Sequence, residues 1–223
     1  MKDKQNFIIF GSSSELAKTF IKGINSNHTF CLSNRKSSNG KNFLYIKDYL
    51  DNINEIIEFC RKVHNPIVIF FNGYLKEDRP NLNPTNDQIL KTFEINYLVP
   101  FEITKKLINE GLDIKKFVYI SSFAAVKLRY KNFNYGSAKK LLEESIKSLD
   151  LTNYLIIRFG KINTKMSESH SSSIFDLDKD EAAKVLLKKI KHDSGLRYPN
   201  LITKILSVFI RFLPYKFLKY FQL

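Results

Sequence analysis

The sequence predicts an α/β fold built on one doubly wound parallel sheet, and three observations lead to this conclusion. Six short apolar runs are spaced along the chain: FIIF at 7–10, TFCL at 29–32, FLYI at 43–46, IVIFF at 67–71, FVYI at 117–120 and YLIIR at 154–158. Segments with helical periodicity lie between these runs. The runs are apolar throughout, which is typical of strands that helices cover on both faces. We therefore expect a three-layer α/β/α arrangement.

The length and composition of the chain favour one domain. Its 223 residues, of which 43% are hydrophobic, can bury a substantial core, and no Pro/Gly-rich linker divides them. We expect a Rossmann-like unit over residues 1–198 and an amphipathic, basic helical tail over 199–223. The net charge of +14 predicts an anionic partner, which nucleic acid, a phosphorylated cofactor or a membrane surface could each supply. Because no stacking aromatic motif or basic recognition helix is present, we expect no nucleic-acid partner.

The sequence also argues against export and against a metal site. Its start, MKDKQNFIIFG, does not resemble a secretory signal, and no apolar stretch reaches the roughly 18 residues of a membrane span. Cys31 and Cys60 are too isolated to form a disulfide framework, which fits a reducing cytoplasm. The histidines are scattered and lack partners at metal-ligand spacing. We expect a cytoplasmic protein without a metal site.

The first apolar run leads into FGSSSELAKTF, which has the features of a phosphate-binding turn. Gly11 can make a tight turn, and the serines that follow can cap a helix. The exposed N–H groups and the positive end of the helix dipole suit a phosphate. A serine-rich turn can also be a plain helix cap, so this segment alone does not decide between the two interpretations.

A second motif lies in NYGSAKKLLEES, where Tyr135 and Lys139 share one face of a helix as residues i and i+4. This spacing is weak evidence by itself, because a lysine-rich amphipathic helix produces it readily. Two further residues strengthen it. Ser122 follows the fifth apolar run, and Asn96 stands upstream in EINYLVP.

Together these segments resemble the classical short-chain dehydrogenase/reductase family over residues 7 to about 166. Gly11 matches the first glycine of the family's nucleotide loop, and Asn96, Ser122, Tyr135 and Lys139 match its catalytic tetrad in order. IRFGKINTKM is similar to the family's P-G-x-x-x-T segment, with Gly160 and Thr164 retained. The departures are Phe10, Glu15 and Ala17 in the nucleotide loop and Phe159 in the later segment. A carboxylate at Glu15 is unfavourable beside a pyrophosphate unless it points away.

The resemblance implies a role for each residue. Tyr135 would donate a proton, Lys139 would lower the pKa of Tyr135 and hold the coenzyme ribose, Ser122 would bind the substrate oxygen, and Asn96 would support a water relay. Arg35 and Lys36 follow the second apolar run without an acidic residue, which favours NADP (NADPH) over NAD. The expected coenzyme contacts are Gly11, Ser12, Ser13, Leu16, Arg35, Asp48, Tyr49, Asn72, Gly73, Lys139, Ile162 and Thr164.

The tail differs in character from the rest of the chain. After Gly195 it has five basic residues and no acidic one. Lys204, Ser207 and Arg211 fall on one helical face, bulky apolar residues cover the remainder, and Pro214 breaks or kinks the helix. This composition suits a membrane interface. The alternative is a helix that docks on the sheet or on a second subunit.

The tail resembles that of reductases acting on polyprenyl-linked ketosugars. This resemblance implies an NADPH-dependent carbonyl reductase for a keto sugar, free or lipid-linked, in surface polysaccharide synthesis at the inner face of a membrane. A lipid or fatty-acyl carbonyl is the alternative substrate. A sugar epimerase and a non-catalytic NADP-binding sensor or scaffold are the rival functions. The sequence leaves the oligomeric state open, a homo-oligomer included.

Overall fold

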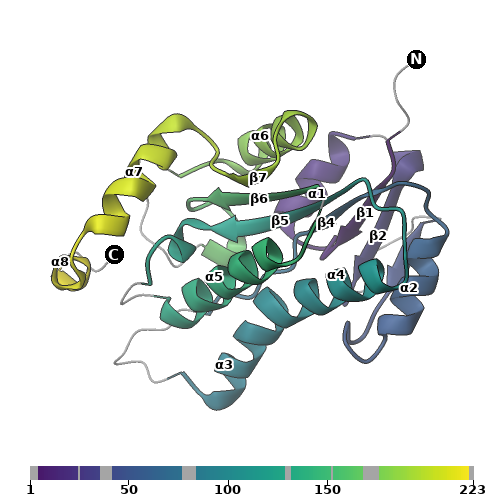
Figure 1. The fold of residues 1–223 in the computed structure, drawn as a ribbon, viewed down its shortest axis with the longest axis horizontal. Coiled ribbons are helices and arrows are strands. Elements are labelled where there is room, and N and C mark those ends of the chain that lie inside the picture. The colour runs from purple at the N-terminus through teal and green to yellow at the C-terminus, as the bar shows by residue number, and fades with distance from the viewer. Residues whose placement is uncertain are drawn as a thin grey trace.

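Seven parallel strands form one sheet in the order β3-β2-β1-β4-β5-β6-β7 (Figure 1). The computed structural model describes residues 5–24, 26–35, 42–76, 84–128, 132–151, 153–167 and 176–220. The strands are β1 Phe7–Phe10, β2 Thr29–Ser33, β3 Phe43–Tyr45, β4 Ile67–Phe70, β5 Lys116–Ser122, β6 Tyr154–Phe159 and β7 Gly195–Arg197. All six expected strands are present, so the doubly wound parallel sheet is confirmed.

Helices cover both faces of the sheet. They are α1 Glu15–Lys22, α2 Ile53–Arg61, α3 Asn86–Phe93, α4 Val99–Asn109, α5 Phe133–Ser148, α6 Lys179–His192, α7 Leu201–Phe212 and α8 Tyr215–Tyr220. Helices α1 and α6 pack on one face, and α2, α4 and α5 pack on the other. A π-helical turn, Glu94–Leu98, joins α3 to α4. The expected three layers are therefore present (Figure 1).

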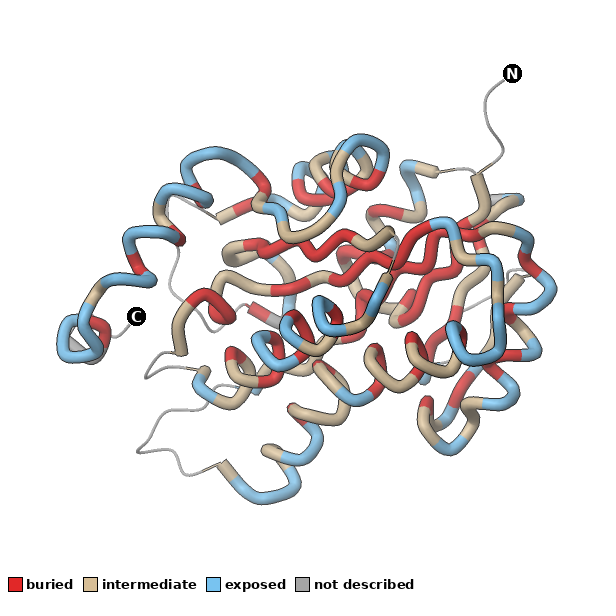
Figure 2. The backbone as a smooth tube through the Cα atoms, in the orientation of Figure 1, coloured by how far each residue is buried: buried red, intermediate tan, exposed pale blue. Residues whose placement is uncertain are grey.

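Strand β1 shows why the expected strands had to be apolar at every position. Ile8 and Phe10 belong to the core under α2, α4 and α5, whereas Phe7 and Ile9 belong to the core under α1 and α6. All four side chains are buried. The central strands are accordingly buried along most of their length in Figure 2. Alternation with polar residues would leave unpaired polar groups against one helix layer.

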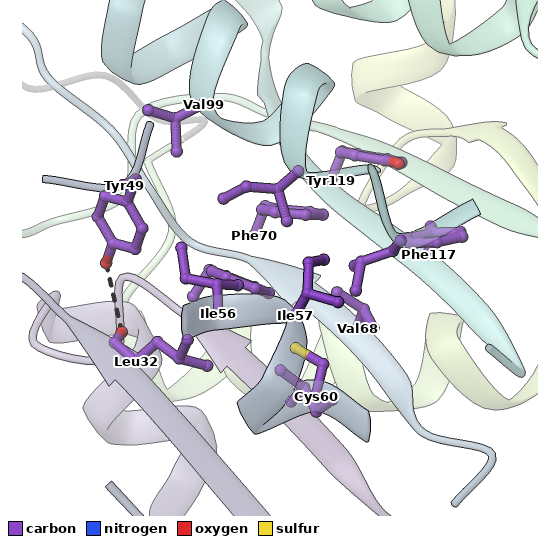
Figure 3. Packing of buried hydrophobic residues seen from close by; sticks show 14 of the residues in the cluster. Leu32, Tyr49, Ile56, Ile57, Cys60, Val68, Phe70, Val99, Phe117 and Tyr119 are labelled. Atoms are coloured by element: carbon purple, nitrogen blue, oxygen red, sulfur yellow. Dashed lines mark hydrogen bonds between the residues drawn. The ribbon is translucent and has the colours of Figure 1, made fainter. Parts of the chain in front are cut away.

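Stacked aromatic rings connect the central strands β1, β4 and β5. The ring of Phe10 stacks on that of Phe70 with 4.8 Å between centroids, and Phe70 stacks on Tyr119 at 5.3 Å. The Tyr119 hydroxyl lies 2.8 Å from the Thr104 hydroxyl of α4, so this buried phenol has a hydrogen-bond partner. Figure 3 shows Phe70 and Tyr119 within this core. The contacts fasten α4 to the middle of the sheet.

Two features differ from the sequence-based expectation. The sheet has a seventh strand, β7, which pairs with β6 and which the six apolar runs did not predict. It has only three residues, Gly195–Arg197, and is therefore too short to contain an apolar run. Gly195 has a positive φ of 70°. Helix α4 was not predicted as a separate element. The tail helix is divided at Pro214, and none of the described helices is long and apolar enough to cross a membrane.

Candidate active site

A cavity of about 1500 Å³ lies at the carboxyl ends of the strands. The loops that follow β1 to β6 all contribute to its wall, as do residues of α5 and α7. Parallel α/β sheets bind their ligands at this edge, because the strand-to-helix loops meet there.

The turn after β1 requires its glycine. Gly11 has φ of 69°, which disfavours any other residue, and a Cβ on it would lie 2.8 Å from the backbone nitrogen of Asn72. The loop therefore lies directly against the end of β4. Ser14 caps α1, since its hydroxyl accepts a hydrogen bond from the Ala17 N–H at 3.2 Å. Gly11, Ser13 and Leu16, three of the expected coenzyme contacts, line the cavity.

Ser12 departs from the expectation that it contacts the coenzyme. It is buried, and both its N–H and its hydroxyl donate to the carbonyl oxygen of Leu32, at 3.1 and 3.2 Å. It is not among the residues that line the cavity. Its hydrogen bonds fasten the loop to β2 instead, because a buried hydroxyl needs a partner.

Glu15 joins two loops across the cavity. Its carboxylate accepts a hydrogen bond of 3.2 Å from the backbone N–H of Lys165, which begins the short 3-10 helix Lys165–Ser167 after β6. This contact directs the carboxylate oxygen toward the opposite loop. Glu15 thus forms a bridge between the loops after β1 and β6.

The loops after β2 and β3 form the rim where Arg35, Asp48 and Tyr49 were expected to contact the coenzyme, and all three line the cavity. Arg35 is exposed, and Lys36 lies outside the described residues. The Asp48 carboxylate caps the next turn by accepting from the N–H groups of Leu50 and Asp51, at 2.8 and 3.0 Å. Tyr49 is buried, and its hydroxyl donates to the Leu32 carbonyl at 3.4 Å (Figure 3).

Lys139 occupies the floor of the cavity beside the end of β4. Its ammonium donates to the backbone oxygens of Ile120, at 3.0 Å, and Asn72, at 3.4 Å. Asn72 and Gly73 both line the cavity. The side-chain oxygen of Asn72 is buried without a hydrogen-bond partner among the described residues. Such an atom is costly unless a bound group or water satisfies it.

Tyr135, Ser122 and Lys139 meet at the end of β5. Helix α5 approaches this point closely, since a Cβ on Gly136 would lie 2.8 Å from the backbone oxygen of Ala124. The Ser122 hydroxyl accepts from the Ala124 N–H at 3.2 Å. The Lys139 ammonium lies 5.9 Å from the centroid of the Tyr135 ring. The structure thus brings together three of the four residues of the expected tetrad.

The pKa values of these groups differ from the expectation that Lys139 lowers that of Tyr135. Burial raises the pKa of the Tyr135 phenol to about 12, although a hydrogen bond with Ser122 acts in the opposite direction. Burial likewise lowers the pKa of Lys139 to about 8, while the Glu143 carboxylate opposes this change. Desolvation therefore outweighs the hydrogen bond from Ser122 at Tyr135 and the attraction of Glu143 at Lys139, and it favours the neutral form of each group.

Asn96 lies in the π-helical turn between α3 and α4, fully buried and outside the cavity wall. Its amide group donates to the carbonyl oxygens of Tyr74 and Thr92, at 2.7 and 2.9 Å, and its oxygen accepts from the Tyr74 N–H at 3.3 Å. These bonds hold the loop after β4. The side chain is thus fully engaged with backbone groups, and the water relay expected of Asn96 stays a prediction.

The loop after β6 supplies Ile162 and Thr164, both of which line the cavity. The hydroxyl of Ser167 donates to the Ile162 carbonyl at 2.5 Å, and Ile162 forms a parallel bridge with Leu177 before α6. Backbone contacts therefore hold this side of the cavity on both flanks.

Sequence reasoning missed a buried ion pair behind the site. Glu143 lies one turn beyond Lys139 on α5, and its carboxylate binds the Arg158 guanidinium of β6 through Nε, at 2.8 and 3.1 Å, and through Nη2. The Ser121 hydroxyl donates to the same carboxylate at 2.5 Å, and Arg158 donates to the Tyr198 hydroxyl at 2.8 Å. The spacing Tyr135, Lys139, Glu143 was a readable signal, because these residues share one helical face.

The residues at this edge fit a nicotinamide dinucleotide phosphate. Gly11 allows close approach of the turn, the start of α1 faces the cavity, and Arg35 provides a cation at the rim. The Asn72 oxygen offers an acceptor that has no protein partner among the described residues. Within the same part of the chain, no cluster of three or more His, Cys, Asp or Glu could hold a metal ion. His170 lies outside it.

No family model and no curated protein matches the chain, but solved structures do. A short-chain dehydrogenase from Burkholderia cenocepacia, in complex with NADP, gives a TM-score of 0.71 at 12% identity over 95% of this chain and 99% of that one. The carbonyl reductase Sniffer of D. melanogaster gives 0.72 at 18%, over 87% and 96%. Ligand-free aldohexose dehydrogenase of Thermoplasma acidophilum gives 0.70 at 14%, over 88% and 93%. The chain therefore has the fold of the short-chain dehydrogenases.

The buried ion pair generates a prediction about stability. Glu143→Gln leaves the Arg158 charge without its counterion, and breaking a buried pair in this way costs about 3–5 kcal/mol of unfolding free energy. Glu144→Gln is the matched control, since Glu144 is an exposed neighbour and its loss should cost less than about 0.5 kcal/mol. Urea unfolding measures both values. Equal losses in the two variants would contradict the role assigned to the pair.

The lowered pKa of Lys139 predicts a pH dependence of stability. Between about pH 8 and the ordinary value of 10.5, the unfolded chain binds more protons at this residue, so the unfolding free energy rises with pH. Lys139→Met lacks this contribution, whereas the shift of Tyr135 is common to both proteins. Urea unfolding across this range should show wild type gaining on Lys139→Met. A constant difference would refute the shift.

Proposed function

We propose that the protein is an NADPH-dependent carbonyl reductase. The observation that carries the proposal is the meeting of Ser122, Tyr135 and Lys139 in one cavity at the carboxyl edge of the sheet. Bound NADPH would supply the hydride to the carbonyl carbon. The Tyr135 hydroxyl would then give its proton to the carbonyl oxygen, so that the product is an alcohol.

Each residue has a role in this proposal that follows from its position. Ser122 hydrogen-bonds the carbonyl oxygen, because its hydroxyl lies beside Tyr135 at the end of β5. The Lys139 ammonium donates two of its three N–H groups to the backbone oxygens of Ile120 and Asn72, and the third would bind the coenzyme ribose. A phenol with a raised pKa remains protonated at neutral pH. Tyr135 therefore holds its proton until the reaction places negative charge beside it.

We place the keto group on a sugar, free or lipid-linked, of a surface polysaccharide, and the reaction in the cytoplasm. The lining of the cavity supports an amphiphilic substrate, because Asn132 and Asp176 offer polar groups while Leu206 and Phe209 of α7 offer apolar ones. The likeness to the fold of an aldohexose dehydrogenase is compatible with a sugar. A fatty-acyl ketone is the competing substrate, and a panel of both classes in the same assay distinguishes them.

Tyr135→Phe tests the chemistry. The change removes only the transferable proton, so turnover should fall by at least about a hundredfold, while NADPH binding stays nearly intact. Single-turnover oxidation of NADPH with a panel of 2-keto and 4-keto sugars measures the rate, and fluorescence titration measures coenzyme binding. Tyr154→Phe, at the amino end of β6 and away from the cavity, is the matched control.

The outcome also separates the proposal from its rival. A Tyr135→Phe protein that turns over at the wild-type rate would exclude Tyr135 as the acid. A wild-type protein that binds NADPH tightly and reduces no ketone of either class would favour a non-catalytic sensor.

Arg35→Ala tests the choice of coenzyme. The exposed guanidinium at the cavity rim would bind the 2′-phosphate, and losing such a charge-assisted contact costs roughly 1.5–3 kcal/mol, about tenfold to a hundredfold in affinity. NADH lacks this phosphate and is the internal control, so its affinity should not change. Calorimetric titration of both coenzymes gives the comparison. Equal affinities of wild type for NADPH and NADH would overturn the assignment.

A further inference from the structure

Helix α7 turns small polar residues toward the protein and large apolar residues toward solvent, the reverse of an ordinary surface helix. Its small polar residues Thr203 and Ser207 face the protein and are each 4% exposed, whereas Phe212 is 78% exposed. The exposed apolar residues of α7 and α8, named here the tail face, are Leu201, Ile202, Ile205, Val208, Phe209, Phe212, Tyr215 and Phe217. On α7 they recur at helical spacing and form one continuous stripe. Figure 2 shows the outward side of this helix as exposed.

The tail face belongs to a helix pair that is firmly held. Ile210 and Leu218 bury their side chains with Val126, and the partly buried Phe123 packs on them. The Lys127 ammonium donates to the backbone oxygens of Arg211, at 3.2 Å, and Leu213, and it lies 4.5 Å from the Tyr215 ring centroid. Asn200 caps the start of α7. The stripe is therefore exposed because of how α7 docks: one side of the helix packs on the protein, and the other is left for a membrane or a second subunit.

The charges beside the tail face identify its occupant. Lys204 and Arg211 are exposed and lie along one flank of the apolar stripe, and Lys216 is exposed on α8. After Gly195 the chain contains five basic residues and no acidic one. A twofold contact between two tail faces would bury the apolar stripe beside cations of both copies, with no carboxylate on the segment to pair with them. An anionic lipid surface pairs with the cations and covers the apolar stripe.

We propose that the tail face docks on an anionic membrane surface, with α7 and α8 lying in the plane of the bilayer. No described helix can cross a membrane, so the contact is peripheral. Bulky side chains enter the acyl boundary while Lys204, Arg211 and Lys216 reach the head groups. The docking needs neither coenzyme nor catalysis and goes beyond the proposed reductase function.

The docked face also adjoins the mouth of the cavity. Phe209 and Leu213 line the active-site cavity, and both also line a smaller apolar hollow of about 550 Å³ with Phe212. A substrate with a hydrocarbon chain could therefore enter from the bilayer without crossing water. This consequence rests on the proposed function, whereas membrane docking itself does not.

Sedimentation with vesicles tests the proposal on the full-length protein. We expect wild type to bind vesicles of equal parts phosphatidylglycerol and phosphatidylcholine, and to bind pure phosphatidylcholine far more weakly. Ile202→Ser/Phe212→Ser should weaken binding at least about tenfold, because both side chains are exposed on the tail face and lie outside the cavity wall. Lys204→Gln/Lys216→Gln should weaken it about 25-fold, since each cation near an anionic leaflet contributes about fivefold.

Matched variants separate tail docking from general attraction to a basic protein. Ile108→Ser/Leu141→Ser removes two exposed apolar side chains from α4 and α5 and should leave vesicle binding unchanged. Tyr135→Phe should bind vesicles as wild type does, which distinguishes failure of this proposal from failure of the reductase function. Thermal melts of Ile202→Ser/Phe212→Ser should match wild type, because neither side chain is buried.

Three outcomes would overturn the proposal. In the first, the wild-type protein stays in the supernatant with anionic vesicles at low salt. In the second, the serine pair on the tail face binds as tightly as wild type, so that charge alone explains the attraction. In the third, the wild type is a dimer by analytical ultracentrifugation, the serine pair is a monomer, and neither binds vesicles. The tail face would then be a contact between two copies of this chain.

Discussion

The buried ion pair between Glu143 and Arg158 joins the elements on which the site depends. It connects α5, which carries Tyr135 and Lys139, to β6, whose following loop forms the opposite wall of the cavity. Ser121 adds β5 to the same network, and Tyr198 adds the segment before α7. Two charges without solvent are tolerated because each is multiply hydrogen-bonded. A shift of α5 would break these bonds and displace Tyr135 from Ser122.

Desolvation determines the electrostatic character of the cavity. Tyr135 and Lys139 lie close together, yet burial raises the pKa of one and lowers that of the other. The site thereby holds a protonated phenol beside an amine that loses its charge at a lower pH than an exposed lysine does. Glu143, one turn away, partly restores the charge on Lys139. The ion pair that holds the helix in place thus also influences the acid–base groups.

Helix α7 of the tail packs on the protein through small polar residues and not through its large apolar ones. Helix α7 offers Thr203 and Ser207 to the protein, and these small residues satisfy their hydroxyls on backbone oxygens of the same helix or its cap. The large apolar side chains of α7 lie on the opposite side of the helix and are therefore exposed. The helix pair packs on Phe123, the neighbour of Ser122.

The sequence by itself determined the parallel sheet, because strands covered on both faces must be apolar at consecutive positions, as in β1. It also determined the order Ser122, Tyr135, Lys139 along β5 and α5, since local spacing sets which residues share a helical face. It could not reveal that Ser12 bonds to β2, that Asn96 holds the loop at Tyr74, or that Glu15 reaches Lys165. Each of these contacts joins segments distant in the chain, and the side chain's direction depends on which backbone groups the fold leaves unpaired. The face that α7 turns outward was likewise decided by tertiary packing, because an amphipathic pattern specifies two faces and not which of them meets the protein.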